Sequence, residues 1–162
     1  MRYAISLFIL LALVSACARN PVMDISNVDV HIKPENAVAD PVATRGHKIR
    51  WGGIIISSTN LKDTTQLEIL SYPLDRAGAP NQNAKASARF IALKNGYLES
   101  VDYAAGRAVT VIGTLEETRV GAVGEAKYTY PVVAIEQLHL WPKDNNNHDS
   151  PIHFGFGLGI IR

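Results

Sequence analysis

The chain has 162 residues, of which 47% are hydrophobic and 19% are charged, and its formal net charge is +1. This length fits one domain with a sizeable core, and the near-zero charge gives no electrostatic footprint for nucleic acid. The single cysteine excludes an internal disulfide, so the stability of the fold has to come from packing.

The first 16 residues have the three parts of a secretory signal. A basic residue follows the initiating methionine, an apolar run occupies residues 3–14, and small residues precede the break at Ala16. The run is too short to cross about 30 Å of hydrocarbon as a permanent helix. We therefore predict a signal peptide over residues 1–16, with cleavage between Ala16 and Cys17.

Cys17 is the residue on which the placement of the protein depends. The segment Val14-Ser15-Ala16-Cys17 resembles the lipobox of bacterial lipoproteins. In that class the cysteine thiol, whose thiolate is a good nucleophile, becomes a diacylglyceryl thioether, and the new amino terminus is usually acylated. Several chains matter, because each buried CH₂ contributes about 0.8 kcal/mol and a single chain binds only marginally. The resemblance implies lipid attachment at Cys17; an ordinary signal peptide with an incidental cysteine is the alternative.

The residue after the lipobox is Ala18 rather than aspartate. In Gram-negative lipoproteins an aspartate there favours retention in the inner membrane. The resemblance to that class therefore implies an outer-membrane protein that is anchored by lipid and faces the periplasm.

The mature chain starts with a segment of low regularity. Removing residues 1–16 leaves 162 − 16 = 146 residues, with 16 − 1 = 15 basic and 15 acidic side chains, and no second apolar stretch long enough to span a bilayer. Prolines and asparagines punctuate residues 17–43, which show no sustained period of 2 or 3.6. We predict that this segment is a lipid-anchored tether, part of which can dock on the domain as an edge strand.

Residues 44–142 read as the β domain. Five segments have the alternation and turn boundaries of strands: 47–56, 64–72, 88–93, 107–116 and 128–141. Gly52-Gly53 lies where the apolar parity of the first segment switches, which predicts a bulge or bend. Pro131 within the last segment predicts an edge strand or a bulge.

Five strands, with room for a short helix over residues 97–105, match the order of an OB-type barrel. We therefore predict a mainly β fold, a small OB-like five-stranded barrel, with a β-sandwich as the alternative. Residues 143–162 are predicted to be a polar linker followed by a Gly/aromatic tail. This tail is either a flexible end or late edge strand, or a segment that adds to the sheet edge of a partner.

A set of ordered motifs resembles the Slp family of outer-membrane lipoproteins. The motifs run from about residue 44 to 142: Arg50-Trp51-Gly52-Gly53, Leu67-Glu68-Ile69, Tyr72-Pro73-Leu74-Asp75, residues 106–113, residues 124–133 and His139-Leu140-Trp141-Pro142. The resemblance implies a lipoprotein on the periplasmic side of the outer membrane. It supplies no reaction and no catalytic residues.

The polar residues give weak signals for chemistry. His148 and His153 lie near two aspartates, but a zinc site needs three or four convergent ligands, and an Asn-rich linker is a poor scaffold. His139, beside Trp141, is expected to have a structural or surface role. Three carboxylates flank a predicted turn and are expected to be solvated: Glu116, Glu117 and Glu125. Hydrolase, metalloprotease and P-loop motifs are missing from the sequence. We therefore predict no enzyme activity, no catalytic residues, no cofactor and no metal.

Aromatic side chains on the predicted strands leave a binding role open. They are Trp51, Tyr72, Phe90, Tyr128, Tyr130 and Trp141. Most are expected in the core, while one or two exposed rings would bind a glycan or a protein.

The leading hypothesis is a lipid-anchored domain with a structural or binding role in the cell envelope. A barrel that binds an envelope saccharide or peptide is the second, and an unrecognised hydrolase is the third. The membrane is an expected partner, and nucleic acid is not.

Overall fold

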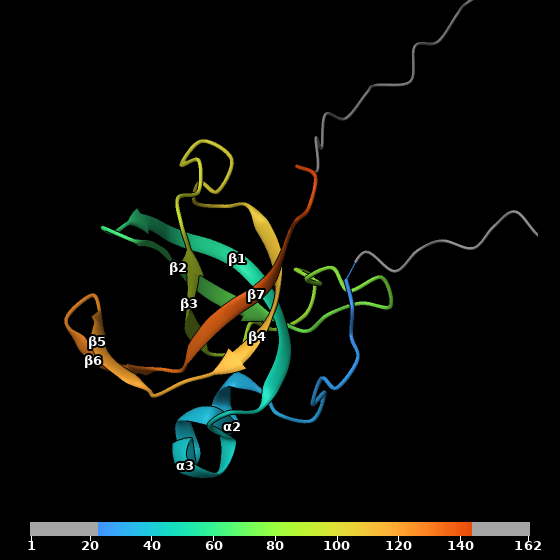
Figure 1. Cartoon of the computed structure of the whole chain (residues 1–162), viewed down its shortest axis with the longest axis vertical. Helices are drawn as coiled ribbons and strands as arrows, with labels where there is room; N and C mark the ends of the chain where they lie inside the picture. The colour runs from blue at the N-terminus through green and yellow to red at the C-terminus, as the bar shows by residue number, and fades with distance from the viewer. Residues whose placement is uncertain (1–22, 144–162) are drawn as a thin grey trace, which may run out of the picture.

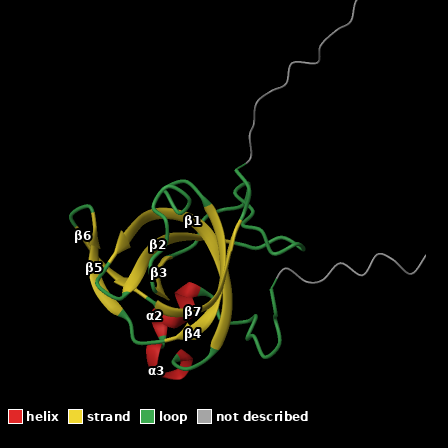
Figure 2. Cartoon of the chain, turned by 45° about the horizontal axis from the view of Figure 1, so that its top comes forward, coloured by secondary structure: helices red, strands yellow, loops and turns green. Residues whose placement is uncertain are grey.

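Five strands close into a barrel in the computed structural model, which describes residues 23–143 (Figure 1, Figure 2). They are β1 (Lys48–Asn60), β2 (Thr64–Tyr72), β3 (Arg89–Asn95), β4 (Ala108–Leu115) and β7 (Val132–Leu140). Their order around the barrel is β1-β2-β3-β7-β4, with β3 and β7 parallel and the other neighbours antiparallel. This is the strand order of an OB-type barrel, so the predicted fold class is confirmed.

Alternating residues of each strand fill the barrel. On β4, Val109, Val111 and Leu115 face inward, as their spacing predicts. At the centre the rings of Trp51 and Phe90 meet edge to face, with their centroids 5.3 Å apart. Aromatic pairs prefer this arrangement, and it adds to the stabilisation from buried area.

The glycine pair in β1 has a different role from the predicted one. The parity does not switch at Gly52-Gly53, because Ile55 continues the buried face of Ile49 and Trp51. The glycines instead lie where β1 pairs with β2 and with β4 at the same time. A side chain on Gly53 would overlap the carbonyl oxygen of Leu70, so glycine is required by the close approach of two backbones.

The bulge of β1 comes later, between Ile55 and Ser57, where the register against β2 shifts. Beyond it, β1 continues to Asn60 through a segment whose polar composition predicts a turn. These residues remain in the strand because they pair with the start of β2, and the Thr65 hydroxyl bonds both Asn60 Oδ1 and Gly96 O.

Two short helices correct the prediction of an irregular tether. They are α2 (Pro34–Ala39) and α3 (Pro41–Thr44), and each has its proline at the first helical position. There the missing N–H is not needed and the fixed φ suits the helix. Asn36 Oδ1 accepts the Lys33 N–H at 2.9 Å, and Asp40 Oδ1 accepts the Ala43 N–H at 3.0 Å. Prolines that suggest breaks in the chain are thus the starts of helices.

The two ends of the barrel are covered by different segments (Figure 1). At the lower end in this view, α2 places Ala37 in the core. At the upper end, loop 96–107 contributes Leu98 and Tyr103. The short helix expected over residues 97–105 is reduced to a turn in which the Asp102 and Tyr103 amides both donate to Glu99 O.

The predicted last strand is divided at Pro131. Before it, β5 (Arg119–Val123) and β6 (Ala126–Tyr130) form a two-stranded hairpin, and after it β7 joins the barrel. The division follows from the fixed φ and missing N–H of proline, which end the β6 pairing. Pro131 O still accepts the Ile91 amide at 2.9 Å and so links the hairpin to β3.

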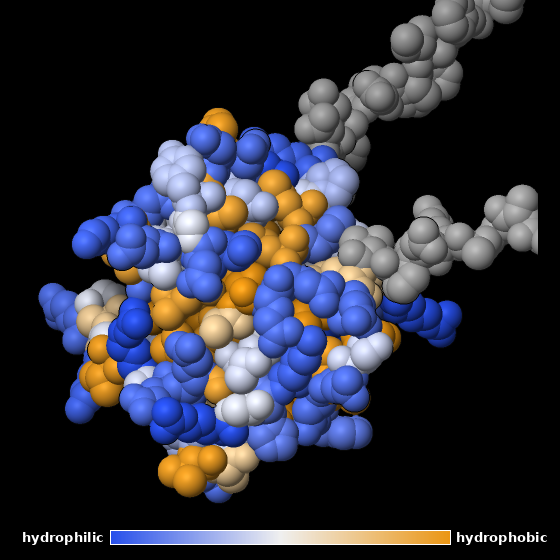
Figure 3. Space-filling view, viewed as in Figure 1, coloured by the Kyte–Doolittle hydropathy of each residue, from blue (hydrophilic) through white to orange (hydrophobic). Residues whose placement is uncertain are grey.

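The surface of the described domain is mostly hydrophilic, with apolar side chains gathered across the middle of the face in Figure 3. Val42 of α3 and Val101 of loop 96–107 are 88% and 78% exposed. Helix α3 and loop 96–107 lie at opposite ends of the barrel, so these two side chains do not form one patch. Within residues 23–143, no helix has the length and apolar character needed to cross a membrane.

Candidate binding cleft

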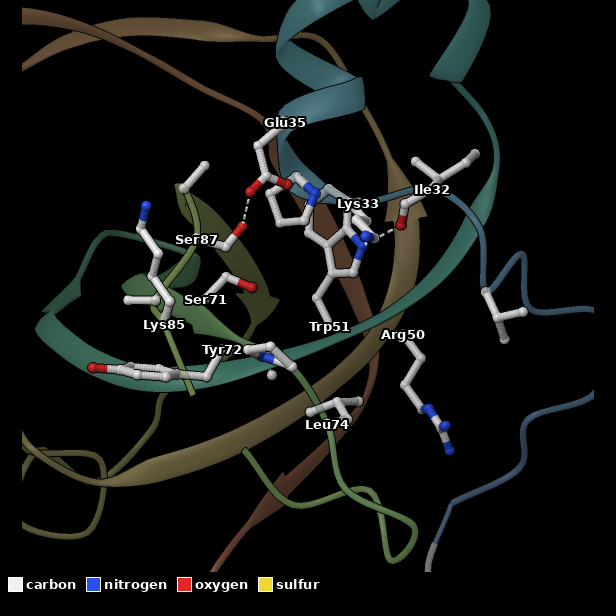
Figure 4. A pocket seen from close by; sticks show the side chains of 16 residues that line it. Ile32, Lys33, Glu35, Arg50, Trp51, Ser71, Tyr72, Leu74, Lys85 and Ser87 are labelled. Atoms are coloured by element: carbon white, nitrogen blue, oxygen red, sulfur yellow. Dashed lines mark hydrogen bonds between the residues drawn. The ribbon is translucent and has the colours of Figure 1, made fainter. Parts of the chain in front are cut away.

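A short strap, defined here as residues 29–33, runs along the start of β1 before α2. Asp29 makes a parallel bridge to Ile49, and its amide donates to Lys48 O at 2.7 Å. The indole N–H of Trp51 donates to Ile32 O at 2.8 Å (Figure 4). Part of the predicted tether thus docks beside β1, as expected, through one β-bridge. The strap is also hydrogen-bonded to Trp51 in the core of the barrel.

The Asp29 carboxylate fixes the turn into the strap. It accepts the His31 amide at 2.9 Å and lies 3.4 Å from His47 Nδ1. The His31 N–H first, and the nearby His47 second, hold the pKa of Asp29 below its ordinary value of 3.8. The ionised form is therefore the one that the strap favours.

We expect this strap contact to be lost in acid. Because the folded-state pKa of Asp29 is lowered, its stabilising contribution is complete above pH 3.8 and disappears as the pH falls through the lower folded value. An NMR titration of the His31 amide should therefore have its midpoint below 3.8, and Asp29→Asn should remove the transition. A midpoint at or above 3.8 would contradict this contact in solution.

A cleft of about 820 Å³ opens between the strap, β1, the end of β2 and loop 73–88. Its size is within the range of small-ligand sites. Apolar groups make most of its wall: Val30, Ile32, Pro34, Trp51, Pro73, Leu74, Ala86 and Ala88. Gly52 also lines the cleft, and a side chain there would meet Leu74 Cδ2 at 2.6 Å. The absence of a side chain on β1 at this position keeps the wall in place.

Three cations surround the apolar wall, each from a different part of the chain. Lys33 comes from the strap, Arg50 from β1 and Lys85 from loop 73–88. Figure 4 shows Arg50 and Lys85 on opposite sides of the cleft. None of the three forms an ion pair with another residue between 23 and 143. The charge of the lining residues is +3 − 1 = +2, with Glu35 as the carboxylate.

The remaining polar groups of the cleft are neutral or already bonded. Glu35 Oε1 accepts the hydroxyl of Ser87, which joins α2 to loop 73–88 (Figure 4). Ser71 is 4% exposed and places its hydroxyl at the cleft wall. Tyr72 is paired across the sheet with Gly52, so no opposing side chain covers its ring.

Most of the aromatic residues are not available for stacking. Trp51 and Phe90 are in the core, and Tyr130 is 5% exposed. Tyr128 and Tyr130 belong to the hairpin, and their ring centroids are 4.7 Å apart. None of the six rings is fully exposed, contrary to the expectation of one or two; Tyr72, Tyr128 and Trp141 are half-buried, and of these Tyr72 lines the cleft.

The hairpin closes the outer face of β2 and β3, which OB folds use for recognition. Tyr130 Oη bonds Glu68 Oε1 at 3.2 Å and Ala122 O at 3.0 Å, and Tyr128 Oη accepts the Arg89 amide at 2.8 Å. Burial, and then the negative charge of Glu68, raises the pKa of Tyr130. These bonds hold the tyrosines as a second small core rather than as an open groove.

A second cavity of about 510 Å³ lies beside Arg107, Trp141 and Lys143. Arg107 donates to Trp141 O at 3.1 Å, and the Trp141 indole donates to Thr110 Oγ1 at 2.9 Å, whereas the buried Nε of Arg107 has no partner among the described residues. His139 packs edge-on against Trp141 at 4.4 Å, which fits the expected structural role. This cavity has fewer apolar walls than the cleft and is the weaker candidate.

The other predicted residues fall in two groups. Glu116, Glu117 and Glu125 are exposed, as expected, and Glu117 pairs with Arg45 at 3.1 Å. Ala16, Cys17, His148 and His153 lie outside the described residues. Among residues 23–143, no group of three or more His, Cys, Asp or Glu is placed to hold a metal ion.

The cleft is the candidate site that sequence reasoning missed. Its lining comes from residues 30–35, 50–52, 71–74 and 85–88, which are far apart along the chain. The prolines that start α2 and α3 were the available signal, because a proline at the first helical position predicts a helix and hence a docked segment.

Comparisons with known proteins agree with the sequence motifs. A family model described as "Outer membrane lipoprotein Slp family" matches residues 14–156. An uncharacterized protein of Haemophilus influenzae is 36% identical over 94 residues, which are 57% of this chain and 51% of that protein. "Uncharacterized lipoprotein YeaY" of Escherichia coli is 31% identical over 96 residues, covering 59% and 49%. The chain thus spans about half the length of the curated relatives it matches.

Two solved structures have a similar chain path. The mitochondrial single-stranded DNA-binding protein Rim1 of Saccharomyces cerevisiae is 18% identical, with a TM-score of 0.38 over 59% of this chain and 94% of that one. A small single-stranded DNA-binding protein of Streptomyces coelicolor is 16% identical, with a TM-score of 0.37 over 59% and 94%. With TM-scores below 0.5, the assignment of the fold rests on the strand order described above.

The family model covers the described barrel, the strap and the predicted lipobox. The chain therefore belongs to the outer membrane lipoprotein Slp family.

Proposed function

We propose that Cys17 carries the lipid that attaches this protein to the outer membrane, and that the barrel faces the periplasm. The proposal is supported by the lipobox and by the match to a family of outer-membrane lipoproteins. Cleavage between Ala16 and Cys17 would free the amino group for a further acyl chain. Two or more chains provide the stable anchoring that one chain does not.

The barrel of this lipoprotein acts as a binding domain rather than as an enzyme. The observation that supports this role is the cleft under the strap. It combines an apolar wall with a cationic rim, which consists of Lys33, Arg50 and Lys85. Binding sites of this size are mostly apolar and contain a few polar groups that orient the ligand. The one carboxylate of the lining, Glu35, is bonded to Ser87 rather than paired with a second acid or a histidine, as acid–base catalysis would need.

A ligand from the cell envelope fits this location. The half-buried ring of Tyr72 offers a face for a sugar or a peptide side chain, which keeps an envelope saccharide or peptide among the candidates. A protein partner is the other candidate class, and it would meet the same strap and rim.

A substitution that fills the cleft tests the binding role. Ala86 lines the cleft and Ala122 is exposed on β5, so Ala86→Phe and Ala122→Phe form a matched pair. Purified protein is screened by thermal shift against muropeptides, envelope oligosaccharides and short-chain phospholipids. We expect at least one class to stabilise the wild type and Ala122→Phe but not Ala86→Phe.

Two results would argue against the cleft as the binding site. One is stabilisation that persists undiminished in a correctly folded Ala86→Phe protein. The other is the lack of any stabilising compound in all three classes, which would favour a structural role for the barrel.

A further inference from the structure

We propose that the cleft under the strap takes an anionic amphiphile, with a phosphate head group at the cationic rim and an acyl body against the apolar wall. This inference rests on the proposed binding role of the cleft and names the chemistry of its ligand. It is drawn from the distribution of charge and apolar groups around the cleft.

The positive charge of the cleft is local. The mature chain has equal numbers of acidic and basic side chains, 15 and 15, whereas the cleft lining has a net charge of +2. Lys33, Arg50 and Lys85 come from three segments and stand around the cleft, without an ion-pair partner among residues 23–143. Three other cations do have such partners: Arg45 pairs with Glu117, Lys48 with Glu136 and Arg89 with Glu68. An anion at the rim would complete the pairing.

Arg50 is the best placed of the three to bind a phosphate. It is half-buried on β1, while Lys33 and Lys85 are exposed. Its guanidinium lies near Gly78, because a side chain on that glycine would be 3.8 Å from an Arg50 terminal nitrogen. A planar guanidinium on a half-buried strand residue suits the bidentate recognition of phosphate oxygens.

The apolar wall of the cleft favours a ligand that also has an apolar part, such as an acyl chain. Ile32, Trp51 and Leu74 line the cleft, with the indole of Trp51 fixed by its bond to Ile32 O. Inorganic phosphate would leave this wall in contact with water, and a neutral saccharide would leave the cations unpaired. An amphiphile with a phosphate uses both features and gains from the removal of apolar surface from water.

The outer-membrane location brings such a ligand within reach. Val30, the first residue of the cleft lining, lies 13 positions after Cys17. A fully extended segment of that length spans at most about 45 Å. If Cys17 is acylated, the cleft therefore stays close to a membrane whose lipids are themselves anionic amphiphiles.

A fluorescence experiment tests the chemistry of the ligand. The protein is the mature chain, residues 17–162, with Cys17→Ala to prevent acylation, exported behind a non-lipoprotein signal. Trp141→Phe leaves Trp51 as the single tryptophan of the chain. The probe is a short-chain phosphatidic acid with brominated acyl chains, used below its micelle concentration, since bromine quenches an indole that it contacts. Phosphatidylcholine with the same chains and inorganic phosphate are the comparison probes.

We expect saturable quenching by the phosphatidic acid, at least tenfold weaker binding of the phosphatidylcholine, and competition by phosphate only at far higher concentration. Arg50→Gln should weaken phosphatidic acid binding about tenfold, as loss of a charge-assisted bond does. Arg45→Gln, which removes an exposed cation outside the cleft, should leave the binding unchanged.

Each contrary result has a distinct meaning. Equal binding of both lipids, or an unaltered affinity in Arg50→Gln, would overturn recognition of the anion. Phosphate that competes as well as the lipid would overturn the amphiphile. No quenching by the lipid, together with a saccharide or peptide whose binding is lost in Ala86→Phe, would overturn this inference and leave the proposed binding role intact. Full quenching in Ala86→Phe would overturn both.

Discussion

A Cys17→Ala variant is expected to be absent from the outer-membrane fraction. The proposed acyl chains are the source of membrane affinity, at about 0.8 kcal/mol for each buried CH₂, and the variant has no thiol to receive them. Fractionation and intact-mass analysis measure the effect. The membrane-extracted wild type should have the mass of residues 17–162 plus acyl chains, and this species should be missing in the variant.

Ala18→Ser is the control for this prediction, because it changes the neighbouring residue and leaves the thiol. It should remain acylated and in the outer membrane. A wild-type mass without modification, or one that retains residues 1–16, would show that Cys17 is not the anchor.

Gly53→Ala should destabilise the barrel by about 2–4 kcal/mol, which is the upper range for forcing extra atoms into a packed site. The new Cβ would overlap Leu70 O and lie 2.8 Å from Ile69 Cγ2. Backbone cannot give way as a flexible side chain can, because Leu70 is paired in register with Ile54 of β1. Denaturant unfolding of the variant beside the wild type measures the change.

Gly106→Ala separates crowding from backbone strain. Gly106 has a φ of +86° and no atom within 4 Å of the position that a Cβ would take. Its substitution should cost about 1–2 kcal/mol through the left-handed conformation alone. A Gly53→Ala protein that is as stable as the wild type, or more stable than Gly106→Ala, would show that the β1–β2 approach is looser than described.

The strands were predictable because each one buries alternate residues. Val109 and Val111 on β4, and Leu67 and Ile69 on β2, have a period of 2 that is visible in the sequence and a partner face in the barrel. The OB-like class followed from the number and order of these segments. The family was predictable from the motifs, and the family model now covers residues 14–156.

Features that depend on contacts between distant segments were not predictable. Gly52-Gly53 was expected to mark a bulge, whereas its role is set by the carbonyl groups of the two neighbouring strands. Residues 34–44 lack a helical period because two helices of 6 and 4 residues are too short to show one. Their stability comes from capping and from the burial of Ala37 against the barrel.

The candidate site was not predictable either, because its residues come from segments that are far apart in the sequence. Lys33, Arg50 and Lys85 are unremarkable as single cations in the sequence, and they become a rim only when the strap lies along β1. The Trp51 indole looked like core, and it is 4% exposed, yet it also forms the floor of the cleft and holds the strap.

NMR mapping of the bound ligand shows whether the cleft under the strap is the ligand site of this lipoprotein. Isotope-labelled mature protein is titrated with the envelope compound that stabilises it most in the thermal screen. We expect the largest shifts at the Trp51 indole N–H and at the Ile32 and Ser87 amides, with the Trp141 indole unchanged. Shifts confined to the β5–β6 hairpin or to the surroundings of Trp141, with Trp51 silent, would contradict it.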